Sequence, residues 1–112
     1  MSLERPLGTL ADTEGVEVLP GIERKTLAYN DQIMGCHFTL EAGAVMPQHH
    51  HEAAQVGYVI AGRLEFRAGD GGFVAGPGAS YAFGPNQEHG ATALEDTEVI
   101  ECFAPIRQEY AL

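Results

Sequence analysis

Short apolar segments separated by glycine-containing turns run through most of this chain. Fourteen glycines serve as punctuation, and no window longer than ten residues shows a convincing 3.6-residue period. A helical turn is expected only near Leu7–Asp12. Repeated short strands between turn residues predict an all-β sandwich or barrel. The expected strands are Val16–Leu19, Glu23–Tyr29, Ile33–Leu40, Val45–His51, Gln55–Ile60, Arg63–Arg67, Gly72–Val74, Ser80–Phe83, His89–Leu94 and Glu98–Phe103.

Three of the connections between these strands have recognisable turn chemistry: Asn30-Asp31, Ala61-Gly62 and Gly69–Gly72. The dipeptide Ala61-Gly62 is expected to close a tight hairpin, and the glycine-rich segment a looser one. Pro47 lacks a backbone N–H, so it is expected at a strand start or on an edge strand.

Composition limits the classes of protein to which the chain belongs. Its 112 residues, 45% hydrophobic and 20% charged, predict one globular domain over residues 1–112. Sixteen acidic against six basic residues, a net charge of −10, argue against a nucleic acid or an anionic membrane as partner. No apolar run approaches the ~20 residues that span a bilayer, and Met1–Gly8 lacks a signal pattern. We therefore expect a cytoplasmic protein, with Cys36 and Cys102 as buried reduced thiols.

Histidines and a glutamine are spaced as metal ligands in the middle of the chain. His49 and His51 stand two apart in an expected strand, so their side chains share one face. They can converge on one metal ion, with Gln55 as an oxygen donor and His89 arriving from another strand. His50 has the opposite parity and is expected to face away. For His37, the expectation is a partly buried, hydrogen-bonded side chain.

The expected ligand set carries no negative charge. Three neutral imidazoles and an amide leave the ion's charge uncancelled, which favours an anionic ligand. Imidazole suits zinc, nickel, copper, iron or manganese, so the identity of the divalent transition metal stays open. The alternative for each histidine taken singly is an ordinary polar residue.

The last expected strand places a carboxylate among apolar residues. Val99, Glu101 and Phe103 share one face, and Arg107 follows a proline. If that face lines the interior, Glu101 is a candidate general acid or base, and Arg107 a partner for a substrate carboxylate. A solvated glutamate and a surface arginine are the alternative. Tyr58, Tyr81 and Gln48 are further pocket candidates, with core packing the alternative for the tyrosines.

Two motifs resemble those of the cupin superfamily. The first comprises Gly43, His49, His51, Gln55 and Gly62, with glutamine where glutamate is usual; the second comprises Gly78, Gly84, Pro85, Asn86 and His89. The resemblance implies a small double-stranded β-helix, the cupin or jelly-roll barrel, with one metal in its lumen. It also implies His49, His51, Gln55 and His89 as ligands, and a homodimer formed through the amino-terminal strands.

The carboxyl-terminal segment resembles one compact cupin family, the pectin degradation proteins. The shared pattern is Glu101-x-Phe103-Ala104-Pro105-x-Arg107, with an acidic and an aromatic residue after it. Members open the ring of the 4,5-unsaturated monouronates left by pectin or alginate lyases. The resemblance implies catalytic and substrate-binding roles for Glu101, Phe103 and Arg107. Glu101 stands where the family has aspartate.

Three other functions remain as alternatives. A non-haem metal dioxygenase would use the same histidines. A non-catalytic sugar-binding cupin would bind a small anionic molecule and release it unchanged. A structural cupin would hold no metal.

Overall fold

The fold is built almost entirely from β-strands. The computed structural model describes residues 3–111. Its elements are β1 (Val16–Leu19), β2 (Ile22–Tyr29), β3 (Met34–Leu40), β4 (Val45–His49), β5 (Ala54–Ala61), β6 (Leu64–Ala68), β7 (Gly71–Ala75), β8 (Ser80–Phe83), β9 (His89–Ala93), β10 (Thr97–Ala104) and the short helix α1 (Gln108–Ala111). The all-β prediction is confirmed, and every expected strand is present with ends shifted by three residues or fewer.

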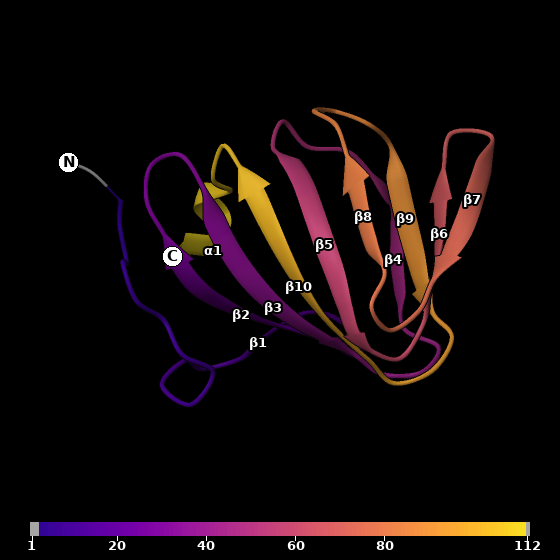
Figure 1. The fold of residues 1–112 in the computed structure, drawn as a ribbon, viewed down its shortest axis with the longest axis horizontal. Helices are drawn as coiled ribbons and strands as arrows, with labels where there is room; N and C mark the ends of the chain where they lie inside the picture. The colour runs from indigo at the N-terminus through magenta and orange to yellow at the C-terminus, as the bar shows by residue number, and fades with distance from the viewer. Residues whose placement is uncertain (1–2, 112) are drawn as a thin grey trace.

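The strands form two antiparallel sheets. The six-stranded sheet has the order β1-β2-β3-β10-β5-β8, and the four-stranded sheet β4-β9-β6-β7. Figure 1 shows the first sheet across the left and centre of the view and the second at the right, with α1 beside β2 and β3. Because neighbours such as β3 and β10 are far apart in sequence, the sheets bring distant segments together.

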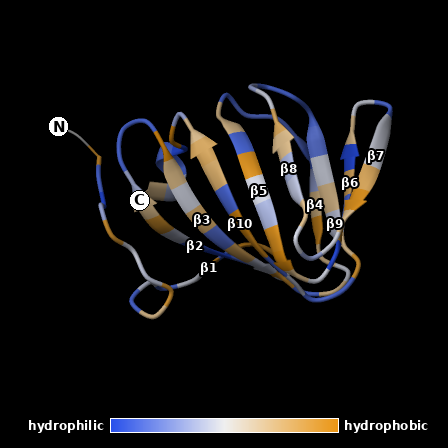
Figure 2. Ribbon diagram, viewed as in Figure 1, coloured by the Kyte–Doolittle hydropathy of each residue, from blue (hydrophilic) through white to orange (hydrophobic). Residues whose placement is uncertain are grey.

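The two sheets pack face to face through aromatic and aliphatic side chains. Phe66 of β6 lies 4.4 Å from the Tyr81 ring of β8 and 5.4 Å from the Phe83 ring, measured between centroids. Along β5, Gln55, Gly57 and Val59 are buried, whereas the intervening side chains face outward. This two-residue period is what a strand with one face on the core requires. In Figure 2, many loops at the upper end of the view are hydrophilic.

Two local predictions are wrong. Ala61-Gly62 does not close a hairpin, because β5 pairs with β10 and β8 whereas β6 pairs with β7 and β9. Gly62 has φ +86°, and a Cβ there would overlap the backbone of Asp96 and Thr97, so this glycine carries the chain from one sheet to the other. Near Leu7–Asp12 there is a turn, not a helix; Thr13 Oγ1 donates to Thr9 O at 2.6 Å.

Other local expectations are confirmed in whole or in part. The glycine-rich segment closes the β6–β7 hairpin, but as a tight two-residue turn, Gly69-Asp70, with Gly71 and Gly72 already in β7. Pro47 lies in β4, an edge strand. Cys36 is a buried free thiol, but Cys102 is only half-buried because it lies on the outer side of β10. Within residues 3–111, no helix is long and apolar enough to cross a membrane.

Candidate metal centre and adjoining carboxyl group

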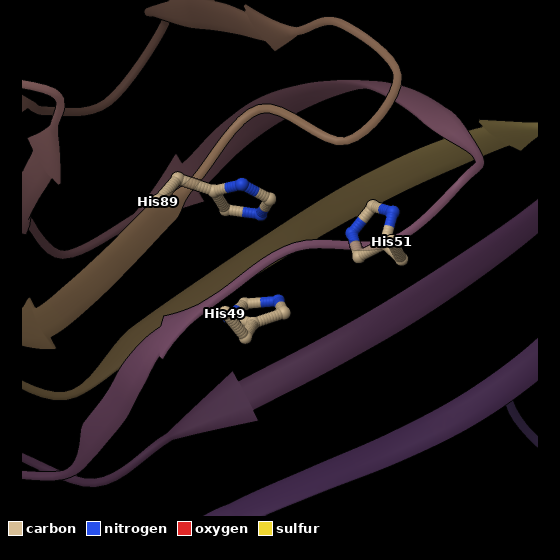
Figure 3. Close-up of side chains that lie close together, drawn as sticks. All are labelled: His49, His51 and His89. Carbon is tan, nitrogen blue, oxygen red and sulfur yellow. The ribbon is translucent and has the colours of Figure 1, made fainter.

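Three histidines converge at one end of the four-stranded sheet. His49 ends β4, His89 begins β9, and the two are register partners. His51 lies two residues beyond β4, since the strand ends earlier than expected. One ring nitrogen from each residue lies within 4.8 Å of the others, and Figure 3 shows the three rings turned toward a shared space. The convergence predicted from spacing is confirmed.

Backbone carbonyls orient all three rings. The Nδ1 atoms of His49, His51 and His89 lie 2.9, 2.7 and 2.8 Å from the carbonyl oxygens of residues 47, 53 and 87. A carbonyl only accepts, so each Nδ1 carries the hydrogen, and in a neutral ring Nε2 keeps its lone pair. His51 Nε2 is buried and, among residues 3–111, has no hydrogen-bond partner. A metal ion fits this donor set, because it would take up these lone pairs.

Burial favours the neutral, metal-binding form of two of the rings. Burial lowers the pKa of His51, and the Arg107 guanidinium lowers it further. Burial also lowers the pKa of His89, in spite of its bond to the Gln87 carbonyl. Neutral imidazole is the form that ligates metals, so the surroundings of both rings prepare them for binding.

Gln55 lies beside the histidines but has a partner of its own. This buried residue of β5 donates from Nε2 to Glu101 Oε2 at 3.1 Å. Because the carboxylate only accepts, the amide oxygen Oε1 is left for another group. Its role as a fourth metal ligand stays a prediction.

Glu101 lies in a row of residues that crosses four strands. Register pairs join Cys36, Glu101, Gly57 and Tyr81 across β3, β10, β5 and β8. Tyr81 Oη donates to Glu101 Oε2 at 2.6 Å. A Cβ at Gly57 would overlap the Tyr81 ring, so glycine at this position lets the tyrosine reach the carboxyl group.

Burial raises the pKa of Glu101, while Tyr81, Arg107 and Gln55 act in the opposite direction. Burial likewise raises the pKa of Tyr81, which keeps its hydroxyl a donor. The surroundings of Glu101 thus favour its neutral form more than water does, as is common for a carboxyl group that acts as an acid or base.

The predicted metal and catalytic residues other than His51 meet in one cavity of about 50 Å³. His49, His89, Gln55, Glu101, Phe103 and Arg107 all line it. The Phe103 ring is 1% exposed and its centroid lies 5.8 Å from that of His51. Arg107 Nη1 donates to Tyr110 Oη at 2.9 Å, and Nη2 to Glu109 Oε2 at 3.4 Å. The face of β10 that carries Glu101 and Phe103 therefore lines the interior, and the alternative of a solvated glutamate is wrong.

None of the remaining candidates lines the cavity. Tyr81 is buried and reaches the site through its hydrogen bond to Glu101, whereas Tyr58 is 50% exposed and Gln48 is exposed. His50 faces solvent as expected. His37 is buried and its Nε2 lies 2.6 Å from Glu98 Oε2, away from the cavity.

Two residues of the site region had no role in the prediction. Tyr110, the aromatic residue that follows Arg107 in the carboxyl-terminal pattern, lines the cavity from α1. Arg24 stacks on Tyr110 from β2. The sequence held one signal for Arg24: it shares a strand face with Ile22 and Thr26, and a charged residue is unusual on a face that packs against the core.

Comparison with known proteins shows the family to which the chain belongs. The cupin domain family matches residues 36–103, more than half of the chain, and the protein belongs to that family. The resemblance read from the two motifs is thereby confirmed, and with it the cupin fold.

Individual proteins of known sequence or structure are similar to this chain over most of its length. The chain is 30% identical to the pectin degradation protein KdgF of Dickeya dadantii (strain 3937) over 101 residues, 88% of this chain and 92% of that protein. It superposes on KdgF from a Halomonas species with a TM-score of 0.86 and 32% identity, covering 92% and 97% of the two chains. An RmlC-like cupin from Shewanella frigidimarina NCIMB 400 gives a TM-score of 0.91 and 25% identity, covering 96% and 98%.

Proposed function

We propose that this protein is a metal-dependent enzyme that opens the ring of 4,5-unsaturated monouronates released in pectin or alginate breakdown. The observation that carries the proposal is the Glu101 carboxyl group, which lines the same cavity as His49 and His89. Similarity to two KdgF proteins, one of them described as a pectin degradation protein, supports the choice of substrate.

His49, His51 and His89 would hold the metal through Nε2, with Gln55 as a fourth ligand. The donor set suits a divalent ion such as zinc, nickel, manganese or iron. When bound, the ion supplies a positive charge that attracts an anionic substrate and polarises its oxygens. The ligands cancel none of that charge, which suits a small carboxylate in a protein with a net charge of −10.

Glu101 moves the proton in this mechanism. Its carboxylate takes the proton from the anomeric hydroxyl, the bond between C1 and the ring oxygen breaks, and C1 becomes an aldehyde. The ring oxygen becomes a ketone at C5, and C4 gains the proton, so the product is an isomer of the substrate. A positioned acid or base contributes typically ~10²–10⁴ in rate. The raised pKa suits a group that must both accept and return a proton.

The other two residues bind and shield the sugar. The planar fork of Arg107 would pair with the substrate carboxylate. Phe103 forms an apolar wall next to the His51 ring, where it would exclude water from the reacting atoms.

The decisive experiment follows the ultraviolet band of 4,5-unsaturated galacturonate, with a chelated sample for the uncatalysed rate. Faster loss of the band with metal, abolished by chelation, is the expected result. No acceleration with zinc, nickel, manganese or iron would overturn the proposal. Oxygen uptake under iron loading would then indicate a dioxygenase, and binding without turnover a sugar-binding cupin.

We also expect a homodimer in the cytoplasm. Of the amino-terminal strands, β1 is an edge of the six-stranded sheet, and its Val16 is 47% exposed. In the same sheet, the outer side of β5 presents Val56, Tyr58 and Ile60, which are 43–50% exposed, and a second copy would cover such an apolar edge and face. Light scattering coupled to size exclusion should give twice the 12.0 kDa chain mass; a monomer at micromolar concentration would contradict this.

A further inference from the structure

The Tyr110 ring lies under two guanidinium groups. Arg24 Cζ is 4.3 Å and Arg107 Cζ 4.1 Å from its centroid. The negative face of an aromatic ring attracts cations, so this ring partly compensates two positive charges that would otherwise repel each other at close range. A carboxylate ion-paired with both guanidinium groups, at N–O distances of about 2.8 Å, would compensate the same two charges.

Arg24 is an unusual residue for the interior of this chain. It is 6% exposed, and its side chain donates one hydrogen bond, from Nε to Thr26 Oγ1 at 3.1 Å. Among residues 3–111, no carboxylate oxygen lies within ion-pair distance of its guanidinium. Burial of this cation is costly where no carboxylate of the described residues pairs with it, and an anionic ligand would offset that cost.

Tyr110 also separates two cavities. The metal-centre cavity measures about 50 Å³, far below the roughly 300–1,000 Å³ of small-molecule sites. A second cavity of about 190 Å³ is lined by Arg5, Arg24 and Tyr110, with Glu14 also on its lining. If the ring moved aside, the two spaces would join, with the histidines and Glu101 at one end and two arginines at the other.

Contacts of the ring and of the backbone hold Tyr110 in place. The ring lies edge-on to Phe38 and Phe103, and its hydroxyl accepts a hydrogen bond from Arg107. Thr26 Oγ1 donates to the Tyr110 carbonyl at 2.7 Å, and Tyr29 Oη to the Ala111 carbonyl at 3.3 Å. None of the residues of α1 is fully buried, and α1 is a strand of neither sheet, so the ring can move aside while the strand pairing of both sheets is kept.

Positive charge gathers at this end of the molecule. Three of the six basic residues of the chain, Arg5, Arg24 and Arg107, line the two cavities. In a chain with sixteen acidic residues, such a local concentration focuses anions on one entrance.

We propose that the Tyr110 ring occupies the place of the substrate carboxylate, and that Arg24 binds this carboxylate together with Arg107 once the ring moves aside. The choice of a uronate rests on the function proposed above, whereas the pairing of a carboxylate with Arg24 rests on the geometry. Arg24 is thus a substrate-binding residue in addition to those that the family resemblance implies.

Calorimetric titration with galacturonate and with galactose, its neutral counterpart, tests this proposal without turnover. The metal-loaded wild-type protein should bind the acid more tightly than the neutral sugar. Arg24→Gln should weaken galacturonate binding about 10–100-fold, the range expected for one charge-assisted pair, and leave galactose binding unchanged. The matched control is Arg63→Gln, which removes an exposed arginine paired with Glu95 and should change neither affinity.

A second variant tests whether the Tyr110 ring occupies the carboxylate position or forms a fixed wall of the binding site. Tyr110→Ala should tighten galacturonate binding, since the ring no longer competes for the arginines, whereas loss of a wall would weaken it. Thermal unfolding of each variant reports whether the fold is retained. Equal affinity of the wild type for acid and neutral sugar, no binding of galacturonate, or weaker binding by Tyr110→Ala would each overturn the proposal.

The two proposals fail separately. If Arg24→Gln loses galacturonate affinity but the wild type leaves the unsaturated sugar intact, the ring-opening function is wrong and the arginine pair stands. If ring opening proceeds but Arg24→Gln binds galacturonate as tightly as Arg63→Gln does, the ring-opening function stands and the role of Arg24 is wrong.

Discussion

His49, His89 and Glu101 line one cavity, and the His51 ring lies beside that of His89. The contacts that hold the histidines and the contacts that hold the carboxyl group differ in their separation along the chain. Each histidine ring is oriented by a backbone carbonyl two residues away in the chain. Glu101, in contrast, is held by Tyr81 and Gln55, which lie 20 and 46 residues away and reach it across strands. Local backbone geometry therefore positions the histidine half of the site, whereas the order of the strands positions the Glu101 half. Different substitutions should disturb the two halves.

Removal of a histidine should have the largest effect. His51→Ala deletes one of three converging donors, so we expect loss of the bound metal and of essentially all metal-dependent activity. Metal content after dialysis, measured by mass spectrometry, checks this. His50→Ala, an exposed neighbour in the same run, is the matched control and should retain both; equal loss in the two variants would contradict local control of the site.

Glu101→Gln should separate the two halves. Turnover should fall by ~10²–10⁴ because the proton carrier is gone, while metal content stays at the wild-type level. Steady-state kinetics and metal analysis on the same preparation measure both. Glu98→Gln lies three residues earlier on the outer side of β10, where it pairs with His37, and should keep full activity. Full activity in Glu101→Gln would mean that Glu101 transfers no proton.

Gly57→Ala should disturb the Glu101 half through packing alone. A methyl group here displaces the Tyr81 ring, so we expect stability to fall by about 1–3 kcal/mol and turnover by up to ~10²-fold, with metal retained. Denaturant unfolding and kinetics are the measurements. Gly35→Ala on β3, whose nearest neighbour would be the Ala28 carbonyl at 3.9 Å, should be nearly neutral. Similar losses in both variants would indicate a general strand effect.

The smallest effect concerns the buried thiol in the same row. Burial raises the pKa of Cys36 from 9.0 to about 11. The folded state thus holds its proton more tightly than the unfolded chain does. The associated stability is present below pH 9 and is lost as the pH rises through 11, by roughly 2–3 kcal/mol in total. Unfolding free energies from pH 8 to 11 should decline less steeply in Cys36→Ala; identical slopes would show that the thiol is not responsible.

The contrast in range also explains what the sequence could predict. The convergence of the histidines follows from their spacing, although His51 lies beyond the end of β4, because the carbonyls that orient the rings lie within two residues. The inward position of Glu101 follows from parity on β10, but its pairing with Tyr81 requires the strand order β10-β5-β8, which no local pattern encodes. The same reason made Ala61-Gly62 misleading, since a tight turn between two strands does not reveal that they belong to different sheets.

Gly57, Tyr81 and Glu101 also determine how this protein can be recombined with its relatives. Glutamate has one methylene more than aspartate, which extends the Glu101 carboxyl group by about 1.5 Å and lets it accept the hydrogen bond from Tyr81. The Tyr81 ring in turn has room only because residue 57 of β5 is a glycine. A chimaera that imports an aspartate-bearing β10 alone would leave the Tyr81 hydroxyl without its acceptor. The three register partners on β5, β8 and β10 therefore have to be exchanged together. A graft between such proteins should take matching residues from all three strands and not one continuous segment of the chain.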